Sequence, residues 1–429
     1  TMTRLIGFFG NANYSYEDRY FVDASVRMDG SSMFGSNRRW GTFWSAGLGW
    51  NLHQESFAKS LSFIDQLRLR ASTGYTGSQS FYPYQALMMY RYQSSLAYQD
   101  YIGTVIKAFG NPDLKWQRTQ KSNLGIDFGF FNQRISGYFN YFVENSKDLL
   151  VDVNMVSYLG FDSYKANLGE TQNRGFDFNV KWNIYQNKQL KVNLFVNGQH
   201  YTNKLSKISS GLSSFNEKAD VAGSNKPHVR YIEGASVNTI WVVPSAGIDP
   251  ATGKEVFISV DGSYTDTWSE KNYVPYATTD PTLIGTFGLN VFYKGFELNT
   301  NFYYRFGGYA YNETLVDKVE NVDPYKNVDR RALYDRWSTP GVATAYKAIT
   351  NRTKTLPTSR FVEKNNILST NSLSLAYTFP VAWTRPWGAE YLKLTLIAND
   401  FFRLSTMKRE MGTTYPFARH YSLTAQLTF

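Results

Sequence analysis

Apolar and polar residues alternate with a period of two in many stretches of this chain. In the closing stretch, residues 420–429, the apolar face consists of Tyr421, Leu423, Ala425, Leu427 and Phe429. Successive side chains of a β-strand point to opposite faces, so this pattern predicts a strand that is apolar on one side and polar on the other. A half-buried strand of a soluble sheet would show the same pattern. Chain ends normally fray into solvent, however, so a closing strand that ends on an aromatic residue favours an outer-membrane barrel with its apolar face toward lipid.

Similar alternation predicts strands along the whole chain, over residues 6–16, 22–28, 40–50, 67–72, 121–130, 134–144, 176–184, 192–198, 287–293, 296–306, 373–379, 392–398 and 420–429. Short turns and long loops alternate between these strands. Outer-membrane barrels have short periplasmic turns and longer extracellular loops. The sequence therefore predicts an all-β fold, an antiparallel transmembrane β-barrel portion of about 13 strands with long extracellular loops.

Two connections, residues 205–281 and 307–366, are too long for ordinary loops and should fold as structured excursions. The first contains the segment GIDPATGKEVFI (247–258), which is typical of a small hairpin. In the second, an amphipathic run predicts a short helix over residues 328–337. This helix would either contact a partner or brace the loop, and we favour the brace.

The number and direction of the strands indicate that the barrel is not complete within this chain. Bacterial single-chain barrels have an even number of strands and both termini in the periplasm. An odd number of strands, the first of which already runs toward the periplasm, does not satisfy this rule, and no secretory signal precedes the first predicted strand. We therefore expect residues 1–429 to form one partial barrel domain whose first strands lie elsewhere.

Composition agrees with a barrel and disagrees with membrane helices. Aromatic residues make up 17% of the chain, with 32 Tyr and 31 Phe, yet no apolar run is long enough for a membrane helix. Alternating strands hide lipid-facing surface from an average hydropathy. Arg68 and Arg70 share the inner face of one predicted strand, where an aqueous lumen would solvate them and a dry core would not. The sequence has no cysteine, which excludes disulfides and thiolate-bound metal.

The net charge of +10 is compatible with nucleic acid, with an anionic membrane surface, or with charges dispersed over loops. No run of Lys and Arg is long enough to favour nucleic acid, so we expect dispersed charges and no nucleic-acid partner.

The sequence carries no coherent catalytic or metal-binding pattern. The histidines lie far apart, at His53, His200, His228 and His420. No nucleophile elbow, phosphate loop or dinucleotide motif occurs. Asp261 and Asp266 lie in a Gly/Ser-rich loop without an EF-hand pattern, and we interpret them as solvated. We expect no enzyme, no cofactor and no metal site.

Five segments resemble SusC-type TonB-dependent transporters, the nutrient importers of Bacteroidetes outer membranes, and occur in the order in which that family carries them. They are YFVDASVRMDGSSMFG (20–35), NPDLKWQRTQKSNLGIDFGFFNQRISGYFNYF (111–142), NLGETQNRGFDF (167–178), GTFGLNVFYKGFEL (285–298) and SRFVEKNNILSTNSLSLAYTFP (359–380). The resemblance covers nearly the whole chain and corresponds to the C-terminal part of the family's barrel.

The resemblance implies a barrel of about 22 strands with a plugged lumen. It also implies an N-terminal plug domain, a segment that contacts TonB, and a SusD-type surface lipoprotein that caps the barrel. This sequence lacks the plug, the TonB-contacting segment and the first barrel strands, so it would need an upstream half on the same or another chain. The implied role of the parent protein is the import of oligosaccharides or peptides across a Gram-negative outer membrane, in contact with its lipid and lipopolysaccharide.

A tyrosine-rich loop after the fourth predicted strand is the candidate binding site. Its rings are those of Tyr82, Tyr84, Tyr90, Tyr92, Tyr98 and Tyr101. Tyrosine offers a rigid apolar face with a hydroxyl at its tip, which suits stacking on sugar rings or packing against a partner protein. The rings could equally pack the loop on itself or rim the barrel. The hypothesis is that this loop contacts substrate or the SusD-type lid.

Two other functions stay open beside transport. A SusC-like barrel could serve as a structural or assembly subunit of a larger outer-membrane complex, and an upstream plug with a TonB-contacting segment would argue against that role. An outer-membrane enzyme would need a cluster of carboxylate, His or Ser side chains on adjoining lumenal strand ends, and the sequence offers none.

Overall fold

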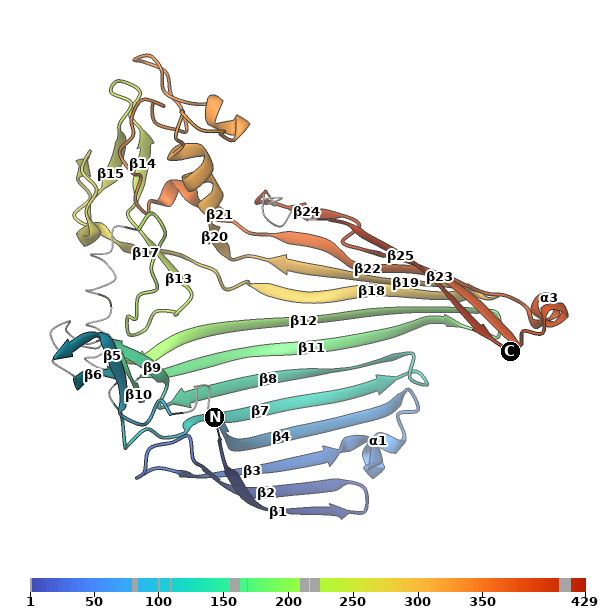
Figure 1. Ribbon diagram of the computed structural model, residues 1–429. Helices are drawn as coiled ribbons and strands as arrows, with labels where there is room; N and C mark the ends of the chain where they lie inside the picture. Colours follow the sequence, from blue (N-terminus) through green and yellow to red (C-terminus); the bar gives the residue numbers. More distant parts are fainter. Residues whose placement is uncertain are drawn as a thin grey trace.

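The computed structural model of the chain describes residues 2–78, 84–98, 101–108, 110–154, 163–167, 169–208, 216, 224–408 and 418–429. Within them, thirteen strands follow one another across a single antiparallel sheet (Figure 1). We call these strands the wall; they are β1 (Leu5–Tyr16), β2 (Tyr20–Ser31), β3 (Trp40–Asn51), β4 (Ile64–Ser78), β7 (Gln117–Phe130), β8 (Ile135–Lys147), β11 (Glu170–Gln186), β12 (Leu190–Lys207), β18 (Leu283–Tyr293), β19 (Phe296–Phe306), β22 (Ile367–Thr378), β23 (Tyr391–Asn399) and β25 (His420–Thr428). The predicted all-β fold with about 13 antiparallel strands is confirmed.

Short turns join the strands at one end of the wall, and long connections join them at the other end (Figure 1). In the turn between β18 and β19, Lys294 and Gly295 both adopt positive φ, at 46° and 93°. A Cβ atom at position 295 would lie 2.8 Å from the carbonyl oxygen of Thr378, so this turn needs glycine for both its backbone conformation and its space. The chain thus reverses tightly at the short-turn end.

The wall has an apolar outer face and a polar inner face. On β7, Leu124 lies opposite Ala71 of β4 and is 60% exposed, as a side chain that faces lipid would be. The preceding residue, Asn123, lies opposite Ser72 and points to the inner face, where its amide donates a hydrogen bond of 3.4 Å to the Ser72 hydroxyl. This alternation is the period of two that the sequence shows.

Aromatic side chains lie at both ends of the wall. At the short-turn end, Tyr20 stacks on Trp50 with ring centroids 6.3 Å apart, and both side chains donate hydrogen bonds to Glu55, at 2.8 Å and 3.0 Å. At the long-loop end, Phe8 stacks on Trp40 with centroids 6.4 Å apart. Aromatic girdles flank the apolar band of outer-membrane barrels in the same way.

The smaller elements near the wall belong to its connections. A hairpin of β5 and β6 and a pair formed by β9 and β10 lie apart from the sheet, whereas β24 pairs with β22. These elements and the neighbouring short helices are β5 (Met89–Tyr98), β6 (Tyr101–Ala108), β9 (Leu150–Asn154), β10 (Ser163–Asn167), β24 (Arg403–Ser405), η1 (Leu52–Gln54), α1 (Ser56–Lys59), α3 (Val381–Thr384) and η7 (Arg385–Trp387). In the described ranges, no helix has the length and apolar character needed to cross a membrane.

The two long excursions fold against each other into one body, which we call the loop unit (residues 224–281 and 307–366). It lies at the long-loop end of the wall (Figure 1). Val243 forms a parallel bridge with Thr358, and the amide of Ser359 donates to the carbonyl oxygen of Val243 at 3.0 Å. The loop unit contains β13 (Thr239–Val242), β14 (Ser245–Ile248), β15 (Glu255–Ile258), β16 (Tyr264–Thr265), β17 (Val274–Thr278), β20 (Tyr309–Tyr311), β21 (Val362–Lys364), η3 (Glu270–Asn272), η4 (Leu315–Glu320), η5 (Arg330–Leu333) and η6 (Ser359–Phe361).

The loop unit has a small apolar core of its own. Side chains from both excursions are buried in it, namely Ile240, Trp241, Val242, Val243, Phe257, Val316, Val319 and Phe361. Burial of apolar side chains is the main force that stabilises a folded domain. The loop unit is therefore stabilised by its own apolar core, as a water-soluble domain is.

One of the two predictions for the excursions is confirmed and one is wrong. The predicted hairpin at 247–258 is present, since β14 and β15 pair antiparallel. The predicted helix at 328–337 is only the 3-10 turn η5. Asp329 caps this turn by accepting a hydrogen bond from the amide of Arg331, but Tyr334 is already extended and Asp335 adopts a φ of 54°. A residue with left-handed backbone conformation ends a helix. The helix therefore cannot continue through Asp335, although the amphipathic pattern of side chains does.

Candidate functional site

The structure brings together only part of the predicted tyrosine site. Tyr90 and Tyr92 lie two residues apart on β5, share one face of the β5–β6 hairpin, and are 61% and 79% exposed. Tyr101 begins β6 and is 76% exposed. Tyr84 lies apart from them, with its hydroxyl accepting a hydrogen bond of 3.2 Å from the amide of Met2. Tyr82 lies outside the described residues, as does the side chain of Tyr98, which ends β5.

A row of polar side chains crosses the inner face of the wall. Arg70 of β4 donates two hydrogen bonds to Asp127 of β7, each of 2.7 Å, and a third of 3.0 Å to the Asn140 amide oxygen on β8. The amide nitrogen of Asn140 then donates to Asp177 of β11 at 3.1 Å. The Arg70 side chain is 40% exposed on the open sheet that this chain forms, and its partners are polar, as on the inner face of an outer-membrane barrel. For Arg70, this placement agrees with the predicted aqueous lumen. Arg68 instead lies over the ring of Phe21, 4.6 Å from its centroid.

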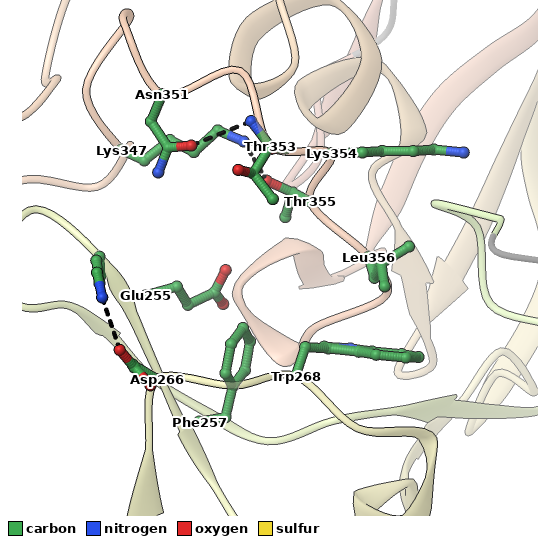
Figure 2. Close-up of a pocket in the computed structure, with 11 residues that line it drawn as sticks. Glu255, Phe257, Asp266, Trp268, Lys347, Asn351, Thr353, Lys354, Thr355 and Leu356 are labelled. Atoms are coloured by element: carbon green, nitrogen blue, oxygen red, sulfur yellow. Dashed lines mark hydrogen bonds and ion pairs between the residues drawn. The ribbon is translucent and has the colours of Figure 1, made fainter.

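A cleft of about 280 Å³ lies within the loop unit, between its two excursions. One side is formed by Lys254, Glu255, Phe257, Asp266 and Trp268, and the other by Lys347, Asn351, Thr353, Lys354, Thr355 and Leu356. Figure 2 shows the two sides facing each other, with the Glu255 carboxylate directed into the space between them. The cleft is thus formed by two segments that are far apart in the sequence.

A buried ion network lies behind the cleft and fixes its two sides. Arg360 donates two hydrogen bonds of 2.8 Å to Glu255, and its Nη2 also lies 2.7 Å from Glu320. The side chains of Arg360, Glu255 and Glu320 are only 10%, 9% and 0% exposed. Glu255 belongs to the first excursion, whereas Arg360 and Glu320 belong to the second. The network therefore joins the two excursions at the base of the cleft.

Lys347 forms the other charged part of this base. Its ammonium donates to the Thr355 hydroxyl at 2.9 Å and to the Asn321 amide oxygen at 3.2 Å, and it also bonds the carbonyl oxygen of Thr353. Burial lowers the pKa of Lys347 from its ordinary value, although the charge of Glu320 acts in the opposite direction. Burial by itself lowers the pKa of the Arg360 guanidinium. The hydrogen bonds with Glu255 raise this pKa by more than burial lowers it, so the net shift is upward.

The remaining pair at the rim is exposed. Lys254 lies 2.8 Å from Asp266, and this hydrogen bond lowers the pKa of Asp266 and raises the pKa of Lys254. His53 and His200 contact backbone groups, of Leu67 and Thr282 respectively. Across the part of the chain that the structure describes, no three His, Cys, Asp or Glu side chains gather as metal ligands would.

The cleft is not predicted by the sequence. Arg360 and Glu255 are separated by 105 positions, and no local pattern pairs residues at that distance. Arg360 does lie in one of the segments that resemble the SusC type, and that resemblance is the one feature of the sequence that draws attention to this residue.

Comparison with known proteins agrees with the geometry. A sequence profile of the family described as "TonB dependent receptor-like, beta-barrel" matches residues 2–312. TonB-dependent receptor P3 of Formosa agariphila is 27% identical over 410 residues, which cover 91% of this chain and 40% of that relative. TonB-dependent receptor SusC of Bacteroides thetaiotaomicron is 28% identical over 397 residues, which cover 89% of this chain and 38% of SusC. A chain of the RagAB peptide transporter matches with a TM-score of 0.86 and 25% identity, over 100% of this chain and 48% of the RagAB chain.

Antiparallel strands with an apolar outer face, a polar inner face and aromatic ends define an outer-membrane β-barrel wall. The chain belongs to the TonB-dependent receptor-like β-barrel family. The resemblance to SusC-type and RagA-type proteins is confirmed, and it indicates the outer membrane and a family of receptors and transporters rather than enzymes. The chain spans half or less of the length of the relatives it matches.

Proposed function

We propose that this chain is a partial barrel domain, residues 1–429, of a transporter that imports nutrients across the Gram-negative outer membrane. An upstream half, on the same or another chain, supplies the remaining strands of a barrel of about 22 strands, a plug and the segment that contacts TonB. A SusD-type lipoprotein covers the long-loop end, and the wall contacts outer-membrane lipid and lipopolysaccharide. The imported nutrient is an oligosaccharide or a peptide.

The open edges of the wall support an upstream half. Among the described strands, β1 pairs only with β2 and β25 pairs only with β23. Unpaired backbone N–H and C=O groups are costly in lipid, so membrane sheets are closed into barrels. Further strands that cover both edges are therefore part of the proposal.

The observation that carries the transport function is the row of hydrogen-bonded polar side chains on the inner face, from Arg70 to Asp177. A wall of this kind encloses a water-accessible passage, and a passage is what an importer needs. The family of the chain supports the same function.

The β5–β6 hairpin is proposed as the contact with the SusD-type lipoprotein or with the nutrient. Tyr90 and Tyr92 present rigid, exposed rings of the kind that dominate protein interfaces. A Tyr90→Ala, Tyr92→Ala double variant should lose lipoprotein affinity or nutrient uptake, whereas a Tyr293→Ala control, which removes a ring that is 47% exposed at the short-turn end of the wall, should not. Unchanged affinity and uptake in the double variant would end this part of the proposal.

The whole proposal is tested by gentle detergent extraction of the native protein with mass spectrometry of every copurifying polypeptide, followed by uptake assays in a deletion strain. A plug-bearing half and one lipoprotein, together with lost uptake of an oligosaccharide or a peptide, are the expected results. Copurification with assembly or secretion subunits, without any uptake defect, would instead identify a structural subunit of a larger complex.

A further inference from the structure

The cleft of the loop unit has the construction of a small-ligand site. Its volume of about 280 Å³ is near the lower end for such sites, which suits one or two rings of a small molecule. The base is rigid, because Glu255 and Thr355 are held by the buried network of Arg360, Glu320 and Lys347. A preformed base reduces the ordering that a ligand would otherwise have to drive.

Paired charges at the base and rim of the cleft favour a neutral ligand over an ionic one. Glu255 is neutralised by Arg360 through two hydrogen bonds of 2.8 Å. At the rim, Lys254 and Asp266 pair with each other at 2.8 Å. Figure 2 shows the Lys354 side chain extending along one side of the cleft, away from the Glu255 carboxylate. An anionic or cationic ligand would have to break one of these pairs, whereas a neutral ligand would leave them intact.

Polar and aromatic groups at the cleft suit a molecule with hydroxyl groups and an apolar face. Phe257 and Trp268 come from the same side of the cleft, and the indole of Trp268 is fixed by a hydrogen bond of 3.1 Å to the carbonyl oxygen of Pro357. On the opposite side, the side-chain oxygen of Asn351 accepts a hydrogen bond of 3.1 Å from the backbone amide of Thr353, and the side-chain nitrogen of Asn351 is a donor that a ligand hydroxyl could use. A sugar ring offers hydroxyl groups at its edge and C–H groups on its face.

We propose that the cleft between residues 254–268 and 347–356 binds a neutral saccharide unit of one or two rings. Trp268 supplies the surface on which the ring rests, and Asn351 and the Lys254–Asp266 pair supply hydrogen bonds to its hydroxyl groups. The physiological meaning rests on the proposed import function, in which this site would hold an oligosaccharide at the long-loop end before it enters the passage. The binding itself does not depend on import.

The test uses the full protein with its native partners, purified in lauryldimethylamine oxide, a detergent that contains no sugar. Maltose, lactose and xylobiose are titrated separately by saturation-transfer difference NMR, together with digalacturonic acid and trialanine. We expect at least one neutral disaccharide to bind. Its affinity should fall about tenfold or more in Trp268→Ala, as loss of one ring contact predicts, and should fall also in Asn351→Ala.

Trp383→Ala is the matched control, because Trp383 on α3 is 62% exposed and lies at the short-turn end. It should bind as the unaltered protein does. Heat-modifiable migration of each variant verifies that the barrel is folded, and Trp268→Phe, which keeps a ring, should restore part of the affinity.

Three results would overturn the inference: no binding of any neutral disaccharide, binding that Trp268→Ala leaves unchanged, or binding of digalacturonic acid or trialanine that Trp268→Ala abolishes. A failure of the proposed import function would look different. In that case the disaccharide would still bind at the cleft, and deletion of the gene would leave uptake unaffected.

Discussion

The wall and the loop unit contain the same kind of ion pair in opposite surroundings. Arg70 in the wall and Arg360 in the loop unit each bind a carboxylate through two hydrogen bonds, of 2.7 Å and 2.8 Å. Arg70 keeps 40% of its side-chain exposure, whereas Arg360 keeps 10%. Water can replace the lost partner of an exposed charge but not of a buried one. The two ion pairs have similar hydrogen-bond geometry, but loss of the buried pair should cost more stability than loss of the exposed pair. The wall should therefore tolerate substitutions on its inner face better than the loop unit tolerates them at the base of the cleft.

The largest effect is expected from Arg360→Met. This change leaves Glu255 and Glu320 buried without their cation and should destabilise the loop unit by about 3–5 kcal/mol. Hydrogen exchange of the protein in nanodiscs should then show faster exchange in β13, β15 and β21 and unchanged exchange in the wall. Full protection of β15 and β21 in this variant would show that the network does not join the excursions.

A change of the lipid-facing surface should come next. Leu124→Arg places a charge near the middle of β7 on the outer face and should destabilise the barrel by about 2–4 kcal/mol, measured by urea unfolding in liposomes. Asn123→Arg is the matched control on the inner face of the same strand. If both variants were equally stable, the assignment of the two faces would be wrong.

Arg70→Ala removes the ion pair between Arg70 and Asp127, which corresponds in the wall to the Arg360–Glu255 pair of the loop unit. Because the pair is exposed to the lumen, its loss should cost only about 0.2–1 kcal/mol by the same urea measurement. A loss as large as that of Arg360→Met would contradict the view that the inner face is in contact with water.

The smallest effect is expected on the stability of η5 at low pH. The hydrogen bond from Arg331 holds the pKa of Asp329, the cap of η5, at about 2, below its ordinary 3.8. The folded state favours the charged form, so the stabilising contribution of Asp329 is complete above pH 3.8 and is lost as the pH falls through about 2. Exchange in residues 328–334 should therefore rise in this window, and Asp329→Asn should remove the pH dependence. Identical acid profiles in the two proteins would contradict the capping role.

The strands of the wall could be predicted from the sequence, whereas the cleft could not. Alternation such as that of Phe176, Asp177 and Phe178 is local, and a sheet built from consecutive strands needs only local pairing. The cleft depends on Glu255 and Arg360, whose contact follows from the folding of two distant excursions. The predicted helix failed for a related reason, because the positive φ of Asp335 interrupts a pattern that its neighbours support.

A nitroxide scan along β11, from residue 176 to residue 183, with the protein in lipid bilayers, measures directly whether the wall has one face toward lipid and one toward water. Single cysteines can be introduced without interference from this chain, which has none of its own. We expect oxygen to collide most with labels at positions 176, 178, 180 and 182. A water-soluble nickel complex should collide most with labels at positions 177, 179, 181 and 183. Equal access of the nickel complex to both sets would contradict a wall that has lipid on one side and water on the other.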